Sequence, residues 1–290
     1  MATNIRDVKL RITATKKTEQ ITNAMNMISA AKLKTAEKAI KGYQPYLKQI
    51  QDVVKNIMNN LDETKEIHNL LLDKREVNKV CYCIITTDKG LAGAFNNNLF
   101  KELKSILRDN KEKFVVAPIG LKGYYFVKKN KYPIYLDKYI QVKDNVEFNE
   151  LIPFIRDLIK GYVFGEFDKV IVIYNHYVNT LIQNVKQFEL LPIQENFKDE
   201  NHSSVYEFDG DTEQMLNMIL PIYVENVLYG LILNSKASEH ASRLNAMKAA
   251  TDNAKEVVEK LELLYNRVRQ QAITLEITDI VGGASVINNK

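Results

Sequence analysis

The C-terminal part of this chain is organised by residues 237–275, which read ASEHASRLNAMKAATDNAKEVVEKLELLYNRVRQQAITL. Apolar and small side chains recur there at two positions of a seven-residue repeat. One position holds Ala237, Leu244, Thr251, Val258, Tyr265 and Ala272, and the other holds His240, Met247, Ala254, Leu261, Val268 and Leu275. A sustained seven-residue repeat imposes a left-handed supercoil, because its seam must keep facing a partner helix. We therefore expect one long helix from about residue 211 to about residue 280, wound around another helix.

The partner helix is predicted at the other end of the chain. Ile5, Val8 and Ile12 recur at helical spacing, and residues 25–39 are rich in alanine, leucine and lysine, which favour helix. Pro45 should bend this helix, which we expect to continue to about Leu61. A helix of roughly 55 residues would be about 80 Å long, at about 1.5 Å per residue. Because so long a helix needs support along its length, the terminal segments are expected to form an antiparallel pair.

The middle of the chain has a different pattern. Short apolar runs bounded by charge predict strands at residues 80–87, 114–119 and 169–177, and residues 185–191 could add a hairpin partner. Helices are predicted at 97–107, 121–130 and 148–163. Strands alternating with helices indicate a small Rossmann-like α/β domain with a mainly parallel sheet. The predicted fold class is thus α/β plus a long antiparallel coiled coil. Its predicted divisions are an N-terminal helix (1–61), a globular domain (62–210) and a C-terminal helix with an apical tip (211–290).

Charge distribution, cysteine content and apolar segments indicate the partners and the cellular setting to expect. The first fifty residues hold ten basic and three acidic side chains, a net +7, whereas the whole chain carries +4. A basic helix suggests an acidic partner, nucleic acid or an anionic membrane surface, although a solvated face is the simpler interpretation. Cys81 and Cys83 lie in an apolar run, so we expect buried thiols on opposite faces of a strand, in a reducing setting. We recognise no signal sequence, transit peptide or run of about eighteen apolar residues, and expect a soluble or peripherally attached protein.

Sequence motifs favour no catalytic or cofactor site. The turn from Thr87 to Gly93 lies between a predicted strand and a predicted helix, where a phosphate-binding loop would be found. It has neither the dinucleotide glycine spacing nor the Walker pattern. The four histidines are scattered without metal-ligand spacing, and no serine or cysteine has a recognisable companion base. The basic first helix could contact nucleic acid phosphates, but it lacks an aromatic stacking platform.

Several blocks of this sequence resemble the γ subunit of bacterial F-type ATP synthase. One is residues 273–285, ITLEITDIVGGAS, and a second is residues 20–28, QITNAMNMI, followed by AAKL at 30–33. The loop at 88–96, DKGLAGAFN, and the stretch at 220–226, LPIYVEN, match as well. The blocks occur in the family's order and span most of the chain, with the least similarity at 125–205. The absence of a mitochondrial presequence favours a bacterial origin.

The resemblance implies a non-catalytic rotor shaft that couples ion flow through the membrane to ATP synthesis or hydrolysis. In that family the paired helices turn inside a ring of three α and three β subunits, and the α/β domain binds the ε subunit and the c ring. The resemblance thus implies one copy per three αβ pairs, no cofactor or metal, no nucleic acid partner, and peripheral association with the cytoplasmic face of the bacterial membrane. Without the resemblance, a tethering coiled coil with an α/β head and a nucleotide-dependent enzyme that uses the 88–93 turn remain alternatives.

The resemblance also implies residues that contact other subunits. Arg269 and Gln270 match positions that hydrogen-bond a loop of one β subunit, and Thr274 and Glu276 match neighbouring positions. Met25 matches a first-helix position that faces the β lever, although packing in the helix seam is almost as good an interpretation. The remaining matches lie in the loop near the acidic β lever, and they are Asp88, Lys89 and Ala92. Lys16, Lys17, Lys32 and Lys34 would complement the same acidic surface, and the apolar tip from Ile277 to Ile287 would turn in an apolar collar.

Overall fold

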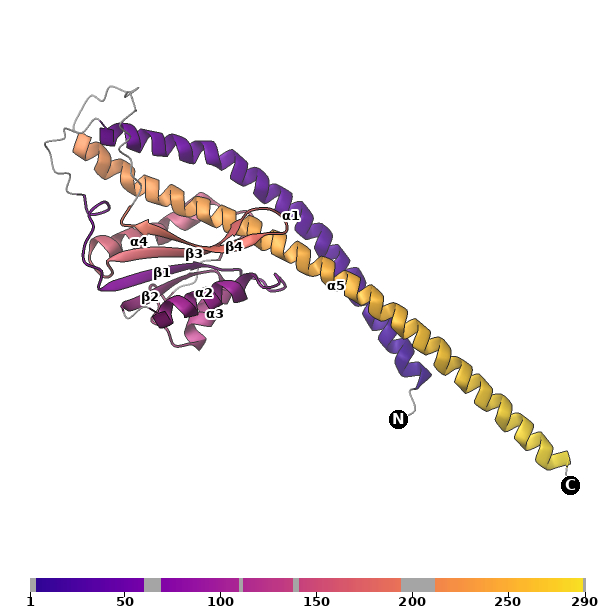
Figure 1. Ribbon diagram of the computed structural model, residues 1–290. Helices are drawn as coiled ribbons and strands as arrows, with labels where there is room; N and C mark the ends of the chain where they lie inside the picture. The colour runs from indigo at the N-terminus through magenta and orange to yellow at the C-terminus, as the bar shows by residue number, and fades with distance from the viewer. Residues whose placement is uncertain (1–3, 60–68, 110–111, 138–140, 194–211, 289–290) are drawn as a thin grey trace. The chain divides into compact units, whose positions relative to one another are not determined.

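The computed structural model describes residues 4–59, 69–109, 112–137, 141–193 and 212–288. Its helices and strands alternate along the middle of the chain and are flanked by two long helices (Figure 1). In chain order they are α1 (Ile5–Asn59), β1 (Lys79–Ile85), α2 (Phe95–Asp109), β2 (Lys113–Ile119), α3 (Leu121–Lys129), α4 (Phe148–Val163), β3 (Lys169–Tyr177), β4 (Gln183–Leu191) and α5 (Thr212–Asn288).

These elements confirm the predicted fold class, since the strands of a small mixed sheet come between the long N- and C-terminal helices in chain order. α1 has 55 residues and stays helical through Pro45, and α5 has 77 residues, extending past the expected end near residue 280. Three expectations concern residues outside the described ranges. They are the end of the first helix at Leu61, the polar stretch at 195–210 and the start of the last helix at Asp211.

The chain divides into two compact units, and both boundaries fall inside the long helices. One unit contains residues 1–28 and 244–290, and the other contains residues 29–243. We call them the helix-pair unit and the α/β unit. The divisions predicted from the sequence, at 61/62 and 210/211, lie at the expected ends of the two long helices. They remain a prediction.

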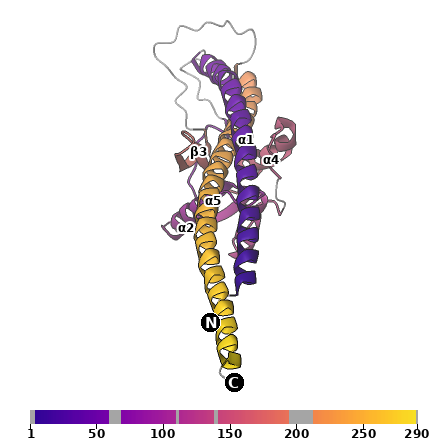
Figure 2. The same cartoon turned by 90° about the vertical axis from the view of Figure 1, so that its right-hand side faces the viewer.

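In the helix-pair unit, the first turns of α1 lie beside α5 and run antiparallel to it (Figures 1 and 2). Three contacts define the register. Asn26 Nδ2 donates to Leu244 O at 3.4 Å, the Oγ1 atoms of Thr22 and Thr251 are 2.8 Å apart, and Lys16 Nζ lies 2.7 Å from Glu262 Oε1. The predicted seam is confirmed in its first part, because Thr251, Met247, Ala254 and Val258 are buried. Beyond Ala272 the described side chains of α5 are exposed.

The α/β unit is built on a four-stranded sheet with the order β2-β1-β3-β4. β1 pairs in parallel with β2 and with β3, and β4 returns from β3 as an antiparallel hairpin. This agrees with the predicted mainly parallel sheet and with the hairpin at 185–191. Because parallel strands need helical crossovers, both faces of such a sheet are covered.

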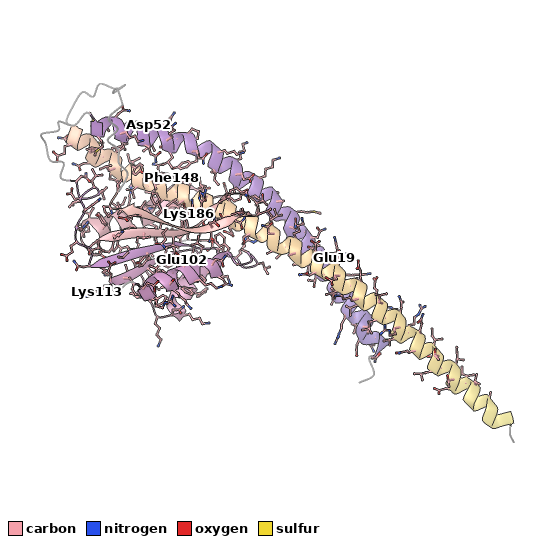
Figure 3. All side chains as sticks on the ribbon, in the orientation of Figure 1. Glu19, Asp52, Glu102, Lys113, Phe148 and Lys186 are labelled. Atoms are coloured by element: carbon pink, nitrogen blue, oxygen red, sulfur yellow. The ribbon has the colours of Figure 1, made fainter. Side chains whose placement is uncertain are left out.

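Two apolar clusters cover the two faces of the sheet. On one face, α2 and α3 supply Leu99, Leu103 and Val127, which pack on Val80, Tyr82, Ile84, Val116 and Ile173. On the other face, α4, α5 and the last turns of α1 pack on Cys81, Cys83, Val115, Val170 and Val172. Phe148, at the start of α4 in Figure 3, stacks edge-on against Tyr229 of α5 with ring centroids 5.2 Å apart. The first part of α5 is therefore a core helix of the α/β unit.

Two sequence expectations need correction. Cys81 and Cys83 share one face of β1, because side chains two residues apart in a strand point the same way; both are buried free thiols, as expected. α5 also contains an 18-residue window of mean hydropathy 1.5, apolar enough by length and composition to cross a membrane. Of that window, 56% is buried inside the protein, and the core contacts of Leu220, Val224 and Leu228 account for its apolar character.

Candidate functional site

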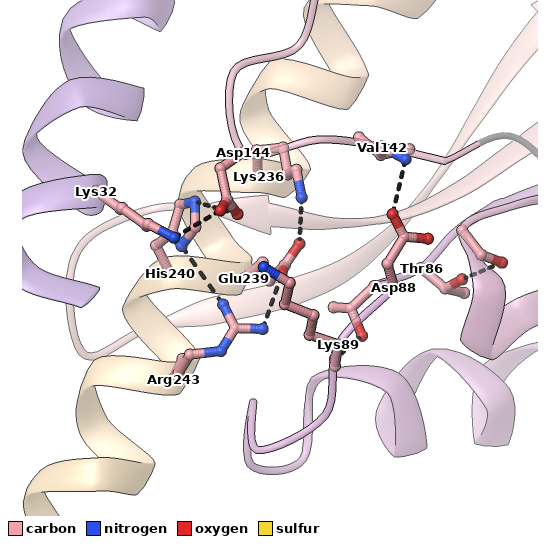
Figure 4. A network of polar contacts seen from close by, with 12 residues as sticks. Lys32, Thr86, Asp88, Lys89, Val142, Asp144, Lys236, Glu239, His240 and Arg243 are labelled. Atoms are coloured by element: carbon pink, nitrogen blue, oxygen red, sulfur yellow. Dashed lines mark hydrogen bonds and ion pairs between the residues drawn. The ribbon is translucent and has the colours of Figure 1, made fainter. Parts of the chain in front are cut away.

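A cluster of ionisable side chains lies where α5 meets the loops of the α/β unit (Figure 4). On α5, Lys236, Glu239, His240 and Arg243 stand at i, i+3, i+4 and i+7, which places them on one face of the helix. All four are buried, with exposed fractions between 1% and 8%. Together with Lys32 of α1 and Asp144 of the segment before α4, we call them the junction cluster.

Glu239 is the centre of the junction cluster. Lys236 Nζ donates to its Oε2 at 2.9 Å, and Arg243 Nη2 donates to its Oε1 at 2.8 Å. One buried carboxylate thus pairs with two buried cations. Such an arrangement is tolerated only because each charge has a close partner, since removing one partner of a buried pair leaves an uncompensated charge.

His240 is neutral in this setting. Burial lowers its pKa to about 4, and the charges of Lys236 and Arg243 act in the same direction, against Glu239 and Asp144. Arg243 Nη1 lies 3.4 Å from His240 Nδ1. A guanidinium can only donate, so we assign Nδ1 as the acceptor and place the ring proton on Nε2, which faces Asp144 Oδ1 at 3.8 Å.

Asp144 joins α1 to the junction cluster. Lys32 Nζ donates to Asp144 Oδ2 at 2.6 Å. Burial raises the pKa of Asp144, but the hydrogen bond from Lys32 and the nearby positive charges outweigh it and hold that pKa below its usual value. Asp144 is therefore ionised at neutral pH and faces both long helices, Lys32 on α1 and His240 on α5.

The loop that follows β1 is held from inside the protein. Thr87 and Asn96 bond each other across it, with Asn96 Nδ2 donating to Thr87 Oγ1 at 2.7 Å. Leu91 and Gly93 take positive φ angles of 61° and 55°, which lets the chain turn tightly into α2. α5 contacts this loop directly, because Ser242 Oγ donates to Ala92 O at 2.7 Å. Arg243 Nη2 also lies 3.5 Å from Gly90 O.

Asp88 lies in the loop after β1, and its carboxylate binds the start of α3. Its Oδ1 accepts from Leu121 N, the first residue of α3, at 2.8 Å, and its Oδ2 accepts from Val142 N at 2.9 Å. Gly120 allows this close turn, since a Cβ there would lie 2.3 Å from Thr86 O. The free amides of a helix N-terminus attract anions, but here the protein's own carboxylate takes that position. A phosphate would meet a negative charge.

The predicted contact residues of this loop therefore differ in their surroundings. Asp88 makes two bonds within the chain, and Ala92 is buried beneath Ser242. Lys89 is exposed. Among the described residues, no group of three or more His, Cys, Asp or Glu side chains is arranged to hold a metal ion.

The other predicted contact residues lie in the helix-pair unit. Arg269, Gln270, Thr274 and Glu276 are exposed on α5, and Figure 3 shows side chains projecting from α5 beyond the beginning of α1. Thr274 Oγ1 donates to Gln270 O at 2.9 Å, a bond within the helix. Apolar side chains in the same segment are also exposed, and they are Leu275, Ile277, Ile280 and Val281. Of the predicted tip at 277–287, the side chains of 283 and 285–287 lie outside the description.

Met25 and the predicted basic residues are placed as follows. Met25 is half-buried in the helix pair, which fits seam packing as well as a partner contact. Lys16 and Lys32 form ion pairs within the chain, with Glu262 and Asp144, while Lys17 and Lys34 are exposed. Sequence reasoning missed the junction cluster. The available signal was a set of ionisable residues at i, i+3, i+4 and i+7 inside an alanine- and serine-rich segment with a buried seam.

Comparisons with known proteins agree with this architecture. A family model described as ATP synthase matches residues 4–287. The central stalk of the Tetrahymena thermophila mitochondrial ATP synthase is 26% identical with a TM-score of 0.60, covering 79% of this chain and 99% of that one. Two Euglena gracilis mitochondrial ATP synthase structures are similar in fold. A rotor chain is 18% identical with a TM-score of 0.64, covering 93% of this chain and 98% of its own. A chain from the OSCP/F1/c-ring assembly is 21% identical with a TM-score of 0.65, covering 98% and 94%.

Proposed function

The chain belongs to the γ-subunit family of ATP synthase and is a non-catalytic rotor shaft, and from this we propose how it couples the two halves of the machine. Ion flow through the membrane sector turns the α/β unit, and the helix pair turns with it inside the ring of α and β subunits. ATP is made or hydrolysed at the β subunits. The shaft itself carries no nucleotide.

The partners follow from the same proposal. One copy serves three αβ pairs, the helix pair and the single-helix end of α5 contact α and β, and the α/β unit binds the ε subunit and the c ring. The protein is then peripheral to the membrane, on the cytoplasmic face of a bacterial cell. The similarity to ATP synthase rotor chains supports this assignment in general terms.

The observation that carries the proposal is the exposed end of α5 beyond Ala272. It presents apolar side chains, Ile277 and Ile280 among them, that no described part of the chain covers. A single helix in water is marginal without tertiary contacts, and exposed apolar surface of this kind marks an interaction site. A ring of subunits around the shaft would cover it.

The shaft acts by contacting the three β subunits unequally. A partner shifts a conformational equilibrium only by the difference in its affinity for the two states. Arg269 can grip a carboxylate of one β subunit with two parallel hydrogen bonds, and Gln270, Thr274 and Glu276 extend that contact. At the α/β unit Lys89 faces the acidic β lever, while Asp88 and Ala92 contribute by holding the loop that presents it. Met25 lies on the first helix toward the same lever.

The contact at Arg269 and Gln270 can be tested in the reconstituted ATP synthase. We expect Arg269→Ala combined with Gln270→Ala to impair assembly or to lower ATP synthesis, because hydrogen bonds to charged groups contribute about 1.5–3 kcal/mol each. Arg267→Ala is the matched control, since a helical residue two positions away does not share the face of Arg269. Unchanged synthesis in the double variant would refute the contact.

A further inference from the structure

The junction cluster lies at the last turns of α5 that belong to the α/β unit. That unit includes α5 as far as Arg243 and α1 from Ser29 onward. Earlier in α5, the contacts combine apolar packing, through Leu220, Val224 and Leu228, with single polar bonds to α4 and β3. From Lys236 to Arg243, by contrast, several ionisable side chains of α5 are buried together. Buried ionisable groups are therefore concentrated in the last turns of α5 that belong to the unit.

The junction cluster and its neighbours tie four segments of backbone together. α5 holds the loop after β1 through Ser242 Oγ to Ala92 O, at 2.7 Å. That loop holds the segment before α4 through Asp88 Oδ2 and Val142 N, at 2.9 Å. The same segment holds α1 through Asp144 Oδ2 and Lys32 Nζ, at 2.6 Å. A continuous series of contacts thus runs from one long helix to the other through the loops of the α/β unit.

Polar contacts of this kind fix orientation more than they add stability. Apolar packing is non-directional, so the core around Leu220 and Val224 defines the rotation of α5 about its own axis less strictly than polar bonds do. Hydrogen bonds and ion pairs require particular distances and angles. Replacing a buried ionic network by apolar residues of similar volume often leaves stability unchanged or higher. The cost of burying these charges is therefore better explained by positioning.

We infer that the junction cluster is the torsional linkage of the shaft: it fixes the angle of α5 against the α/β unit, so that torque on that unit reaches the helix pair. Glu239 bonds Lys236 and Arg243 within α5 itself and so holds the Arg243 side chain in place. Ser242 and Arg243 then carry the linkage to the loop after β1. This inference rests on the proposed rotor function.

The test uses complete ATP synthase with the ring immobilised and a rotation probe on the c ring. The main variant is Lys236→Met, Glu239→Leu and Arg243→Met together, which removes the charges while keeping similar volume. A second variant, Ser242→Ala, deletes a single bond to the loop with minimal change in shape. Glu256→Gln is the matched control, because Glu256 forms an exposed i,i+4 pair with Lys260 on the same helix.

We expect the triple variant to assemble and hydrolyse ATP, with wider angular fluctuations of the stalled rotor and fewer ions pumped per ATP than wild type. Ser242→Ala should show the same change to a smaller degree, and Glu256→Gln should match wild type. If the triple variant does not assemble, the angular fluctuations and ion pumping of Ser242→Ala alone test the linkage. Wild-type fluctuations and pumping in the variants that assemble would overturn the linkage, whereas failure of the wild-type complex to rotate would overturn the rotor function itself.

Discussion

At the scale of single residues, position in space decides what a charged group does. Asp88 and Lys89 are neighbours in a loop that resembles a subunit-contact motif. In the structure they point to different environments, since Asp88 bonds two backbone amides and Lys89 is exposed. The two side chains therefore have separate effects on stability and on contact with other subunits.

We predict that Asp88→Ala lowers the free energy of unfolding by about 1–3 kcal/mol, the cost of leaving buried donors without acceptors. Leu121 N and Val142 N would lose their partners. Lys89→Ala should change stability by less than about 0.5 kcal/mol, as exposed substitutions usually do. Urea unfolding of the full chain measures both. Equal stability of the two variants would contradict the internal role of Asp88.

His240 should make stability depend on pH. Its pKa in the folded protein is lowered to about 4, whereas an unfolded histidine titrates near 6.5. Between these values the unfolded chain binds a proton that the folded chain does not. Stability therefore falls as pH drops from about 6.5 to 4, by up to about 3 kcal/mol from this one group.

The pH effect is measured as a difference between variants, because carboxylates also titrate in acid. Asp144, whose pKa is held below its usual value, loses its contribution at lower pH than His240 does. Urea unfolding of wild type and His240→Gln at pH 7, 5.5 and 4.5 gives the comparison. The variant should lose less stability over this range. Parallel pH profiles would exclude His240 as the source.

At the scale of elements, periodicity predicts the helices and strands well. The predicted range of α4 is the observed one, and each predicted strand overlaps an observed strand. The heptad seam agrees with the burial of Met247, Thr251, Ala254 and Val258. Seam positions after Ala272 are no longer buried, because α1 begins at Ile5 and covers no further turns of α5. A repeat in one helix does not show where its partner ends.

We predict that the hydroxyl pair of Thr22 and Thr251 sets the register of the helix pair. Thr251 is 5% exposed, and its Oγ1 lies 2.8 Å from Thr22 Oγ1 and from Met247 O. A polar residue on an apolar seam commonly fixes register at some cost in stability. Replacing both threonines by valine should therefore change stability by less than about 1 kcal/mol, because no buried hydroxyl is left without a partner.

The register is read from spin labels on cysteines at residues 12 and 258 in the full chain. The double valine variant should broaden the distance distribution between them, while wild type gives one narrow peak. Thr18→Val is the control, because the exposed Thr18 hydroxyl bonds only the Ala14 carbonyl of its own helix. A narrow wild-type distance that the double substitution leaves unchanged would remove the register role. A long wild-type distance would contradict the helix pair.

At the scale of the whole molecule, the chain supplies a shaft and leaves chemistry to other subunits. The carboxyl ends of parallel strands are the usual place for a ligand in an α/β sheet. Here Asp88 fills the start of α3, and Ser242 and Arg243 of α5 bond the loop after β1. The protein's own groups therefore bond the loop and the helix start at this edge of the sheet.

We predict that the isolated full chain hydrolyses no ATP, and that complexes purified through it contain one copy per three αβ pairs. Native mass measurement gives the stoichiometry, and a phosphate-release assay gives the activity. The α and β subunits purified with the chain are the positive control for hydrolysis. Robust turnover by the pure chain would contradict a non-catalytic shaft, and a ratio other than one to three would contradict a single central shaft.

The sequence by itself determined the local structure of this protein: two long helices, a heptad seam, and strands alternating with helices between them. These features depend on the spacing of apolar side chains along a few turns, which a linear sequence displays. It also carried the motifs of the γ-subunit family, because those are contiguous stretches.

Only the tertiary structure decided which ionisable side chains contact one another. Lys32, Asp144 and His240 are far apart in the chain, and nothing in their local sequence pairs them. The strand order, the inward direction of Asp88 and the exposed end of α5 likewise depend on which segments pack together. Where such a group is buried, as His240 is, the electrostatic effect is large, because charges interact more strongly where water is excluded.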